Sequence, residues 1–226
     1  MPDETGSPAG LSRRTFRRAS SDERRQDLIR ATLDCIAERG MHAATVREIA
    51  LRAGVTNGLI RHYFDAKEHM VQEAYRVTMG EMTAMARTAG DSALGRPRER
   101  LRRFVAANLS PPVLDIRRLT LWASFIAMIH VDPAMAAIHR EAYLEFRNEV
   151  EPLVSDVLAE AGRKDDGTES RRTAIKINAA IDGLWLEGAL APELFSKGEL
   201  VAMGIEAVEA ILGLPLGSGE EEPKEN

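Results

Sequence analysis

The residues best equipped for chemistry in this 226-residue chain form the stretch GVTNGLIRHYF, residues 54–64. It sets hydroxyl, amide, guanidinium and imidazole groups within a few helical turns, where such groups hydrogen-bond to phosphates and base edges in the major groove of DNA. Thr56 is placed to cap a helix and to offer its hydroxyl to a phosphate, and Asn57 to read a base edge. Gly58, which costs about 1 kcal/mol inside a helix, leaves room for a close approach. The alternative is a capped surface helix without a ligand, in which His62 is satisfied within the chain.

Three more side chains extend this surface. Arg61 and Tyr63 face away from the packing side formed by Ile60 and Phe64, so they are free to reach bases or backbone. Lys67 follows at the amino end of the next helix, where its charge and the helix dipole together favour a phosphate. The pattern indicates a surface that recognises nucleic acid.

The charge of the chain is unevenly distributed. The formal net charge is -5, but residues 11–76 carry 13 Lys and Arg against 9 Asp and Glu, so the first third is basic and the remainder is acidic. A polyanion responds to such a local surplus rather than to the net charge. Six arginines in SRRTFRRASSDERR favour a flexible basic arm that touches phosphate, and a solubilising tail is the alternative.

The elements that must position these residues are helices, because no stretch alternates apolar and polar residues as strands do. The fold class is therefore predicted to be all-α, with about nine helices. Capping patterns at Ser20-x-x-Glu23, Thr45-x-x-Glu48 and Asp65-x-x-Glu68 mark three helix starts. They predict helices over residues 21–39, 46–53 and 56–64, and a fourth from residue 65 past residue 79.

The predicted second and third helices are joined only by GVT, which forces a steep crossing typical of a helix-turn-helix unit. Gly40 supplies the left-handed stop of the first helix. The apolar residues of the unit should form its inner side: Ile49, Ala50, Val55, Ile60 and Phe64. The first helix should turn Leu28, Ala31, Thr32, Cys35 and Ile36 inward. Further helices are expected near residues 97–109, 113–130, 133–161, 169–191 and 197–212.

Several functional classes lack support. The chain has no apolar run long enough for a bilayer and no secretory signal, so a cytoplasmic location is expected. Its single cysteine, Cys35, is predicted to be a small buried side chain rather than a reactive thiol. No glycine-rich phosphate loop, Cys/His metal-ligand spacing or nucleophile signature is present, so we expect neither an enzyme nor a cofactor or metal.

The segment RRQDLIRATLDCIAERGMHAATVREIALRAGVTNGLIRHYFDAKEHMVQEAYR closely resembles the DNA-binding domain of the TetR family of bacterial transcriptional regulators. The resemblance includes the pattern T-x-x-x-I-A-x-x-A-G-V of residues 45–55 and the sequence YFDAKEHM. It implies that Thr45 and Thr56 touch phosphates and that Tyr63 and Lys67 clamp the backbone. The resemblance also implies a set that faces the groove, namely Asn57, Gly58, Leu59, Arg61 and His62, and we add Arg47 to the DNA-binding residues.

Two positions depart from the family pattern. Thr56 stands where the family usually has serine, which keeps the hydroxyl. Arg61 stands where the family often has tyrosine, and an arginine that reaches the groove favours guanine by about 1 to 3 kcal/mol.

In this family the carboxy-terminal helices form a homodimer and enclose a small-molecule cavity. The stretch AAIDGLWLEGAL resembles the matching helix of the choline-sensing, BetI-like subgroup, which implies a cationic or small organic effector. Aromatic faces hold quaternary ammonium groups by cation–π attraction, so the predicted pocket residues are Trp122, Phe125, Met128, His130, Tyr143 and Trp185. The alternative for each of them is ordinary core.

The predicted dimer interface uses small residues and an apolar stripe in the last two helices: Ala179, Gly183, Leu184, Val201, Ile205, Val208 and Leu212. The stripe alone fits an intramolecular core equally well. Paired half-sites about 34 to 36 Å apart on DNA nevertheless call for a two-fold protein.

These expectations divide the chain into a disordered basic arm (1–19), a helix-turn-helix DNA-binding domain (20–66), a helical effector-binding and dimerisation domain (67–213) and a disordered acidic tail (214–226). The function they predict is a ligand-responsive repressor that binds a palindromic operator as a dimer. By resemblance, effector in the cavity would shift the fourth helix and release the operator. The alternative is a helical binding or scaffold module that keeps the fold without operator recognition.

Overall fold

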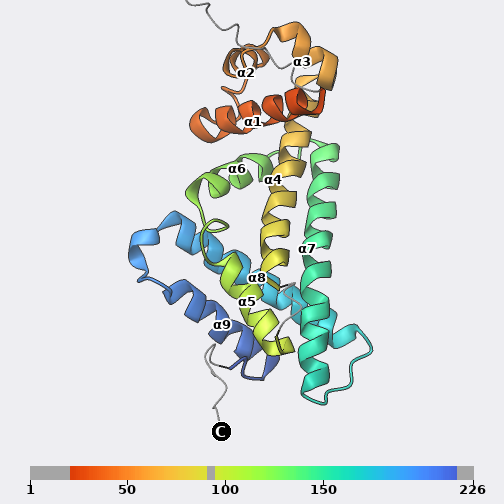
Figure 1. Cartoon of the computed structure of the whole chain (residues 1–226), viewed down its shortest axis with the longest axis vertical. Coiled ribbons are helices and arrows are strands. Elements are labelled where there is room, and N and C mark those ends of the chain that lie inside the picture. Colours follow the sequence, from red (N-terminus) through yellow and green to blue (C-terminus); the bar gives the residue numbers. More distant parts are fainter. Residues whose placement is uncertain (1–20, 91–94, 218–226) are drawn as a thin grey trace, which may run out of the picture.

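Helices account for most of the residues that the computed structural model describes, 21–90 and 95–217, and no strand occurs in these ranges, which confirms the all-α prediction (Figure 1). The elements in chain order are α1 (Ser21–Arg39), α2 (Val46–Arg52), α3 (Asn57–Phe64), α4 (Lys67–Gly90), α5 (Pro97–Asn108), α6 (Ile116–Ile126), α7 (Pro133–Glu160), α8 (Thr168–Leu190), a short 3-10 turn η1 (Pro192–Leu194) and α9 (Glu199–Leu212). No helix of the described part of the chain is long and apolar enough to cross a membrane.

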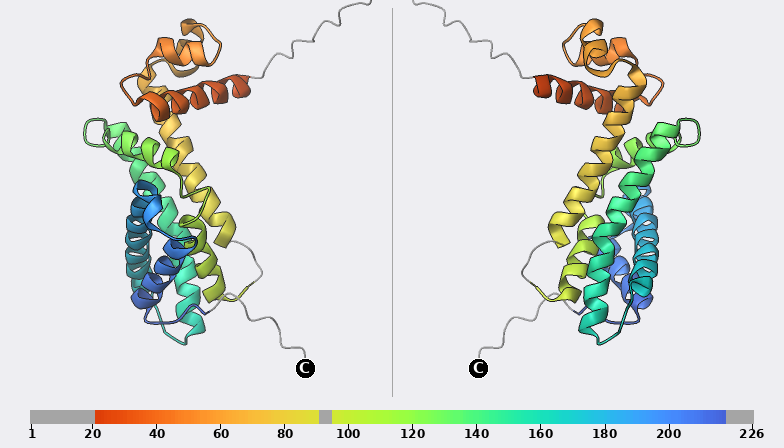
Figure 2. Two further views of the ribbon diagram at one scale, coloured as in Figure 1. Left: turned by 90° about the vertical axis from the view of Figure 1, so that its left-hand side faces the viewer. Right: turned by 90° about the vertical axis from the view of Figure 1, so that its right-hand side faces the viewer.

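The molecule has a small head and a larger body, joined by α4 (Figures 1 and 2). The head consists of α1, α2 and α3, with α2 and α3 at its outer end and α1 facing the body. From the head, α4 runs down into the body beside α7, and α5, α6, α8 and α9 complete the body. A movement of α4 would therefore carry the head with it.

Local signals explain the three short helices of the head. Gly40 ends α1 at φ +78° and Gly54 follows α2 at φ +65°, a backbone region that glycine adopts without strain. Thr45 caps α2, since its hydroxyl accepts a hydrogen bond from the Glu48 amide at 3.2 Å. The predicted inward residues of α1 are buried, and Cys35 among them is fully enclosed. The helix-turn-helix prediction is thus matched in its elements and in its packing.

One predicted helix start is wrong. The fourth helix begins at Lys67 rather than at residue 65, because Asp65 adopts φ +56° and ends α3 by donating its amide to the Arg61 carbonyl at 3.1 Å. Asp65 is therefore the carboxy-terminal cap of α3, and its pattern with Glu68 does not cap α4. The pattern at Thr45 is only half a capping box, because the Glu48 carboxylate binds Arg39 at 2.8 Å.

Two hydrophobic cores follow this arrangement. The first joins the head to the upper part of α4 and extends into the body through Leu121 and Phe125 of α6 and Met135 and Ile138 of α7. The second lies between the lower part of α4 and helices α5, α7, α8 and α9. The head is thus not an isolated unit, because its core continues directly into α6 and α7.

The body departs from prediction at two places. The helix predicted over residues 113–130 is shorter, because Asp115 caps α6 by accepting the Arg117 amide at 2.9 Å and turns follow Ile126. The carboxy-terminal tail was predicted to begin at residue 214, but Leu216 is buried in the second core and donates its amide to Glu209 at 2.6 Å. The predicted basic arm and the rest of the acidic tail lie outside the described residues.

Candidate DNA-binding surface and effector cavity

The exposed face of α3 carries the polar residues that its sequence predicted. Thr56, Asn57, Gly58, Arg61 and His62 are exposed, and the apolar residues of α3 turn the other way into the head. Thr56 occupies the cap position by its backbone, but contrary to expectation its hydroxyl makes no capping hydrogen bond. That hydroxyl is consequently available to an outside acceptor.

Gly58 has no steric partner that requires a glycine. A Cβ built there would lie 3.9 Å from the Thr56 hydroxyl oxygen, an ordinary contact, and its φ is not in the left-handed region. Since the residue costs helix stability and nothing within the described chain demands it, its absent side chain points to a close approach from outside.

The remaining predicted residues lie on α3 and at the starts of α2 and α4. Leu59 and Tyr63 are half-buried, and the Tyr63 ring stands edge-on to His62 at 5.2 Å between centroids. Thr45 and Arg47 are exposed at the start of α2, while Lys67 is half-buried at the start of α4. The predicted DNA-binding residues therefore all belong to the helix-turn-helix unit or to the first residue of α4.

Charge pairing separates these residues from the other cations of the head. Between residues 21 and 76 the chain has nine Lys and Arg. Six of them form ion pairs: Arg24 and Arg30 with Asp27, Arg25 and Arg76 with Glu73, Arg39 with Glu48, and Arg52 with Glu38. Within the described residues no acidic partner approaches Arg47, Arg61 or Lys67. The unpaired cations of this region therefore lie at the start of α2, on α3 and at the start of α4, where their charge favours a polyanion.

A cavity of about 340 Å³ lies in the body, lined by residues of α4, α5, α6, α7 and α8. Of the six predicted pocket residues, Trp122, Tyr143 and Trp185 line it. The Trp122 and Trp185 rings meet edge to face, with 5.9 Å between centroids, and Trp185 is fixed by a 3.0 Å hydrogen bond from its Nε1 to the Val113 carbonyl. The cavity wall is thus largely aromatic and apolar, completed by methionines of α4 and Phe146.

The other three predicted pocket residues lie elsewhere, which corrects the prediction. Phe125 is buried in the first core, where its ring stacks on Tyr75 at 4.8 Å. Met128 packs against the same core, and His130 is exposed in the turns that follow α6. None of the three lines the cavity.

A polar group on one wall of the cavity was not predicted. The Tyr143 hydroxyl donates to Asp182 Oδ2 at 2.7 Å, and Asn178 Nδ2 donates to Tyr143 Oη at 2.8 Å and to Asp182 Oδ2 at 3.0 Å. Asn178 and Asp182 are four residues apart and thus share a face of α8 with Trp185. The available sequence signal was the spacing of Asn178 and Asp182, which lie four residues apart and next to Trp185 in the helical repeat.

The cavity shifts the protonation of its titratable groups. Although Asp182 is exposed at the edge of the cavity, the surrounding protein removes water from its carboxyl group and raises its pKa above the ordinary 3.8. Burial raises the pKa of Tyr143 to about 12. Burial also lowers the pKa of His139, and the charge of Asp182 partly offsets that change. The cavity thus disfavours isolated charge and holds a single carboxyl group among aromatic rings.

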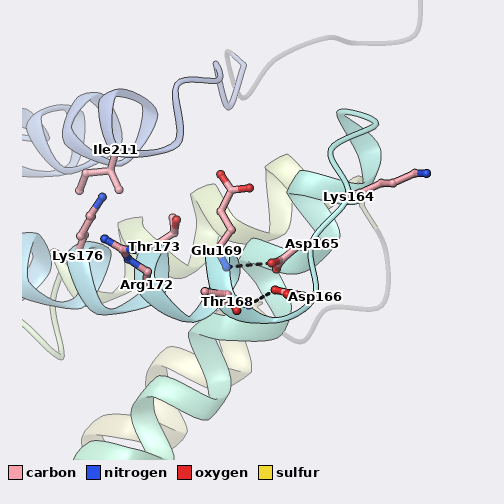
Figure 3. Close-up of a pocket in the computed structure, with 9 residues that line it drawn as sticks. All are labelled: Lys164, Asp165, Asp166, Thr168, Glu169, Arg172, Thr173, Lys176 and Ile211. Atoms are coloured by element: carbon pink, nitrogen blue, oxygen red, sulfur yellow. Dashed lines mark hydrogen bonds between the residues drawn. The ribbon is translucent and has the colours of Figure 1, made fainter.

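A second hollow, of about 670 Å³, lies open at the amino end of α8 (Figure 3). Its carboxylates serve the backbone: Asp165 accepts the amides of Gly167, Glu169 and Ser170, and Asp166 accepts that of Thr168 at 3.0 Å. The hollow therefore follows from the capping of α8, and we assign it no ligand. No group of three or more metal-binding side chains occurs within residues 21–90 and 95–217.

Comparison with known proteins matches both parts of the chain to one family of proteins. Residues 28–74 match the family of bacterial regulatory proteins of the tetR type, and residues 97–213 match the carboxy-terminal domain of BetI-type transcriptional repressors. The chain belongs to the TetR family. It is a ligand-responsive DNA-binding regulator and not an enzyme.

Individual relatives agree with this membership. The chain is 33% identical to the HTH-type transcriptional regulator BetI of Serratia proteamaculans over 80% of this chain and 88% of that one. It is 29% identical to BetI of Burkholderia mallei over 84% and 93% of the two chains. Among solved structures, a transcriptional regulator from Pseudomonas aeruginosa PAO1 shares 32% identity with a TM-score of 0.80, covering 90% of this chain and 97% of that one.

Proposed function

We propose that this TetR-family regulator represses transcription by binding a palindromic operator as a homodimer, and that a small organic cation bound in the body cavity releases it. The observation that carries the proposal is the position of Arg47, Arg61 and Lys67. They are the three cations of residues 21–76 without an acidic partner in the described structure, and they lie at the start of α2, on the exposed face of α3 and at the start of α4. Such a regulator acts beside the chromosome, in the cytoplasm.

On DNA, we assign α3 to the major groove. Asn57, Arg61 and His62 contact base edges from its exposed face, and Gly58 and Leu59 lie against the groove wall. Thr45, Thr56, Tyr63 and Lys67 contact phosphates, and Arg47 adds charge beside them. Arg61 extends from the middle of α3 with no acid to hold it, so we assign it a bidentate contact with guanine.

In the body, the chemistry of the cavity favours a cation. The Asp182 carboxyl group loses solvent in the cavity, and a bound positive charge replaces that lost solvation. Trp122, Tyr143 and Trp185 offer aromatic faces, which attract a quaternary ammonium group. A volume of about 340 Å³ suits a molecule of few heavy atoms.

For the dimer, we assign the exposed face of α8 as the main contact. Ile175, Ala179, Gly183, Leu186 and Leu190 follow one another at helical spacing and are all exposed in the single chain. A row of apolar and small residues allows a second helix to pack closely.

The predicted interface residues of α9 need revision. Val208 and Leu212 are buried in the second core of their own chain, so they have no surface to offer a partner. Leu184, Val201 and Ile205 are half-buried against that same core and offer only their exposed parts.

The experiment that tests operator recognition is fluorescence anisotropy with DNA flanking the gene of the protein, at two salt concentrations. Arg61→Ala should weaken binding and reduce selectivity, whereas Lys67→Ala should weaken binding to all sequences and lower the salt slope by about one. Arg30→Ala is the matched control, because Arg30 is an exposed arginine of the same head that pairs with Asp27.

The outcome also decides between the two function hypotheses. Selective binding that Arg61→Ala impairs and Arg30→Ala leaves unchanged supports the repressor. Weak binding that is indifferent to sequence, and equally affected by both substitutions, favours a scaffold module that has kept only the fold.

A further inference from the structure

One residue pair connects the cavity to the core of the head. His139 lines the cavity from α7, and its Nδ1 lies 2.7 Å from the hydroxyl oxygen of Tyr75 on α4. The two rings are nearly parallel, with centroids 6.4 Å apart and 8° between their planes. Burial raises the pKa of Tyr75 to about 12 and lowers that of His139. The phenol therefore keeps its proton, and its hydroxyl group shares this hydrogen bond with the imidazole.

Tyr75 is also part of the core that the head shares with α4, α6 and α7. Tyr75 is fully buried and stacks on Phe125, and both are part of the core that contains Ile60 and Phe64 of α3. Two residues earlier on α4, Glu73 binds Arg25 of α1 at 2.7 Å. A displacement of α4 at Tyr75 would therefore move α1 and α3 together.

The hydrogen bond is costly to lose. Tyr75 is fully enclosed, and among the described residues His139 is the hydrogen-bond partner of its hydroxyl. A buried hydroxyl without a partner is penalised by the cost of its lost solvation. A ligand that displaces the His139 ring must either break this bond or move α4 with the ring.

Other links between body and head are weaker candidates. Arg117 of α6 binds Asp34 of α1, but both side chains are more than 40% exposed. Gln72 of α4 donates to Asp132 at 3.0 Å, but Asp132 lies before α7 and does not line the cavity. Exposed ion pairs contribute little and are screened by salt.

We propose that His139 and Tyr75 are positioning residues that couple effector binding in the cavity to operator binding by α3, through their hydrogen bond between α7 and α4. This rests on the proposed function, in that the cavity is taken as the effector site. The bond is present in one of the two states of the regulator and is broken or displaced in the other. Coupling of this kind is reciprocal, so the same bond must influence both affinities.

The test measures two dissociation constants for wild type and Tyr75→Phe: one for an operator duplex that the protein itself selects from random DNA, and one for choline. Losing a bond that belongs to one state shifts the equilibrium between the states, so one affinity should rise and the other fall. Their ratio should change about fivefold in total, the size of one hydrogen bond. A merely structural tyrosine would not move the two affinities in opposite directions.

Tyr143→Phe is the matched control. It removes a phenol hydroxyl from the same cavity, but that hydroxyl bonds to Asp182 and Asn178 of α8 rather than to α4. It should change the affinity for choline and leave that for the operator unchanged. His139→Phe removes the same bond from the cavity side, and it should move operator affinity in the same direction as Tyr75→Phe. His139→Phe also replaces Tyr75→Phe in the test if Tyr75→Phe does not fold.

The results separate two failures. If wild type does not bind choline, the proposal of a cationic effector is wrong. The proposed coupling through the Tyr75–His139 hydrogen bond, called the relay below, is then tested by operator affinity alone. Tyr75→Phe should then change the operator affinity by up to about fivefold, and Tyr143→Phe should again leave it unchanged. The relay is overturned if Tyr75→Phe leaves the operator affinity unchanged, if both affinities weaken together, or if Tyr143→Phe alters operator binding as strongly.

Discussion

The Tyr143 hydroxyl donates to Asp182 Oδ2 at 2.7 Å across the gap between α7 and α8, on the wall of a cavity that Trp122 and Trp185 also line. The bond holds the carboxylate in place, and Asn178 adds a second donor. Yet desolvation raises the pKa of Asp182 despite both bonds. The two hydrogen bonds thus orient the Asp182 carboxyl group but do not fully replace its lost solvation. A bound cation would supply the remaining stabilisation of the carboxylate.

The first prediction concerns Asp182→Asn. The substitution keeps the size of the side chain and removes its charge, so choline should bind about tenfold or more weakly, the loss expected for a charged contact in a desolvated site. Isothermal titration calorimetry measures this change. The neutral isostere 3,3-dimethylbutan-1-ol is the control, because it has the shape of choline without its charge and should bind both proteins equally. Equal loss for both ligands would show that shape rather than charge is recognised.

Choline binding should also depend on pH in a defined direction. Asp182 in the free protein has a pKa raised above 3.8, and a bound cation favours the carboxylate and lowers that pKa again. Choline affinity should therefore be constant at high pH and fall as pH drops through the raised pKa of Asp182. His139 acts in the same direction, since it gains a positive charge when pH falls below its own pKa, which burial lowers from 6.5. Titrations that run from pH 3.8, the ordinary pKa of Asp182, to above 6.5, the ordinary pKa of His139, measure the effect, and Asp182→Asn should retain only the part due to His139.

A third prediction separates stability from function at Gly58. Gly58→Ala should raise the free energy of unfolding by up to about 1 kcal/mol, because the site is open and alanine favours helix. It should nevertheless weaken operator binding about tenfold, the size of one lost base contact, because the added methyl group obstructs the approach to DNA. Urea unfolding and anisotropy measure the two effects.

Gly80→Ala is the control for Gly58→Ala. Gly80 is an exposed glycine of α4 with nothing within 4 Å of a built Cβ, so alanine should stabilise the protein there without changing operator affinity. A Gly58→Ala protein that binds the operator normally would contradict the assignment of α3 to the groove.

The head could be predicted from sequence because its signals are local. A cap at Thr45, left-handed glycines at 40 and 54, and a three-residue turn determine where α1, α2 and α3 begin and end. Their exposed faces then follow from helical periodicity. The misplaced start of α4, at Asp65, arose because an aspartate suits both a helix start and a left-handed helix end, and its neighbours in sequence do not decide between them.

The cavity was predicted less well because its residues meet across distant helices. Periodicity showed that Phe125 and Val208 face inward, but it cannot show which core or interface receives them, and both proved to be ordinary core. Conversely, His139 was missed because its partner Tyr75 lies 64 positions away. Such pairings become visible only when α4, α7 and α8 are placed side by side.

The last prediction concerns the dimer. Ile175 of α8 and Leu144 of α7 are apolar helical residues with the same exposure, 42%, but only Ile175 lies on the face assigned to the partner. A glutamate at position 175 would bury an unpaired charge in that interface. Ile175→Glu should therefore give a monomer in sedimentation velocity, and it should weaken operator binding more than tenfold, because a single head engages only one half-site.

Leu144→Glu adds the same charge outside the assigned face and should remain a dimer with normal operator affinity. Comparison of the oligomeric states of Ile175→Glu and Leu144→Glu identifies the interface. If both variants stay dimeric, the contact lies elsewhere on the body. If Leu144→Glu alone dissociates, α7 rather than α8 forms the contact between subunits.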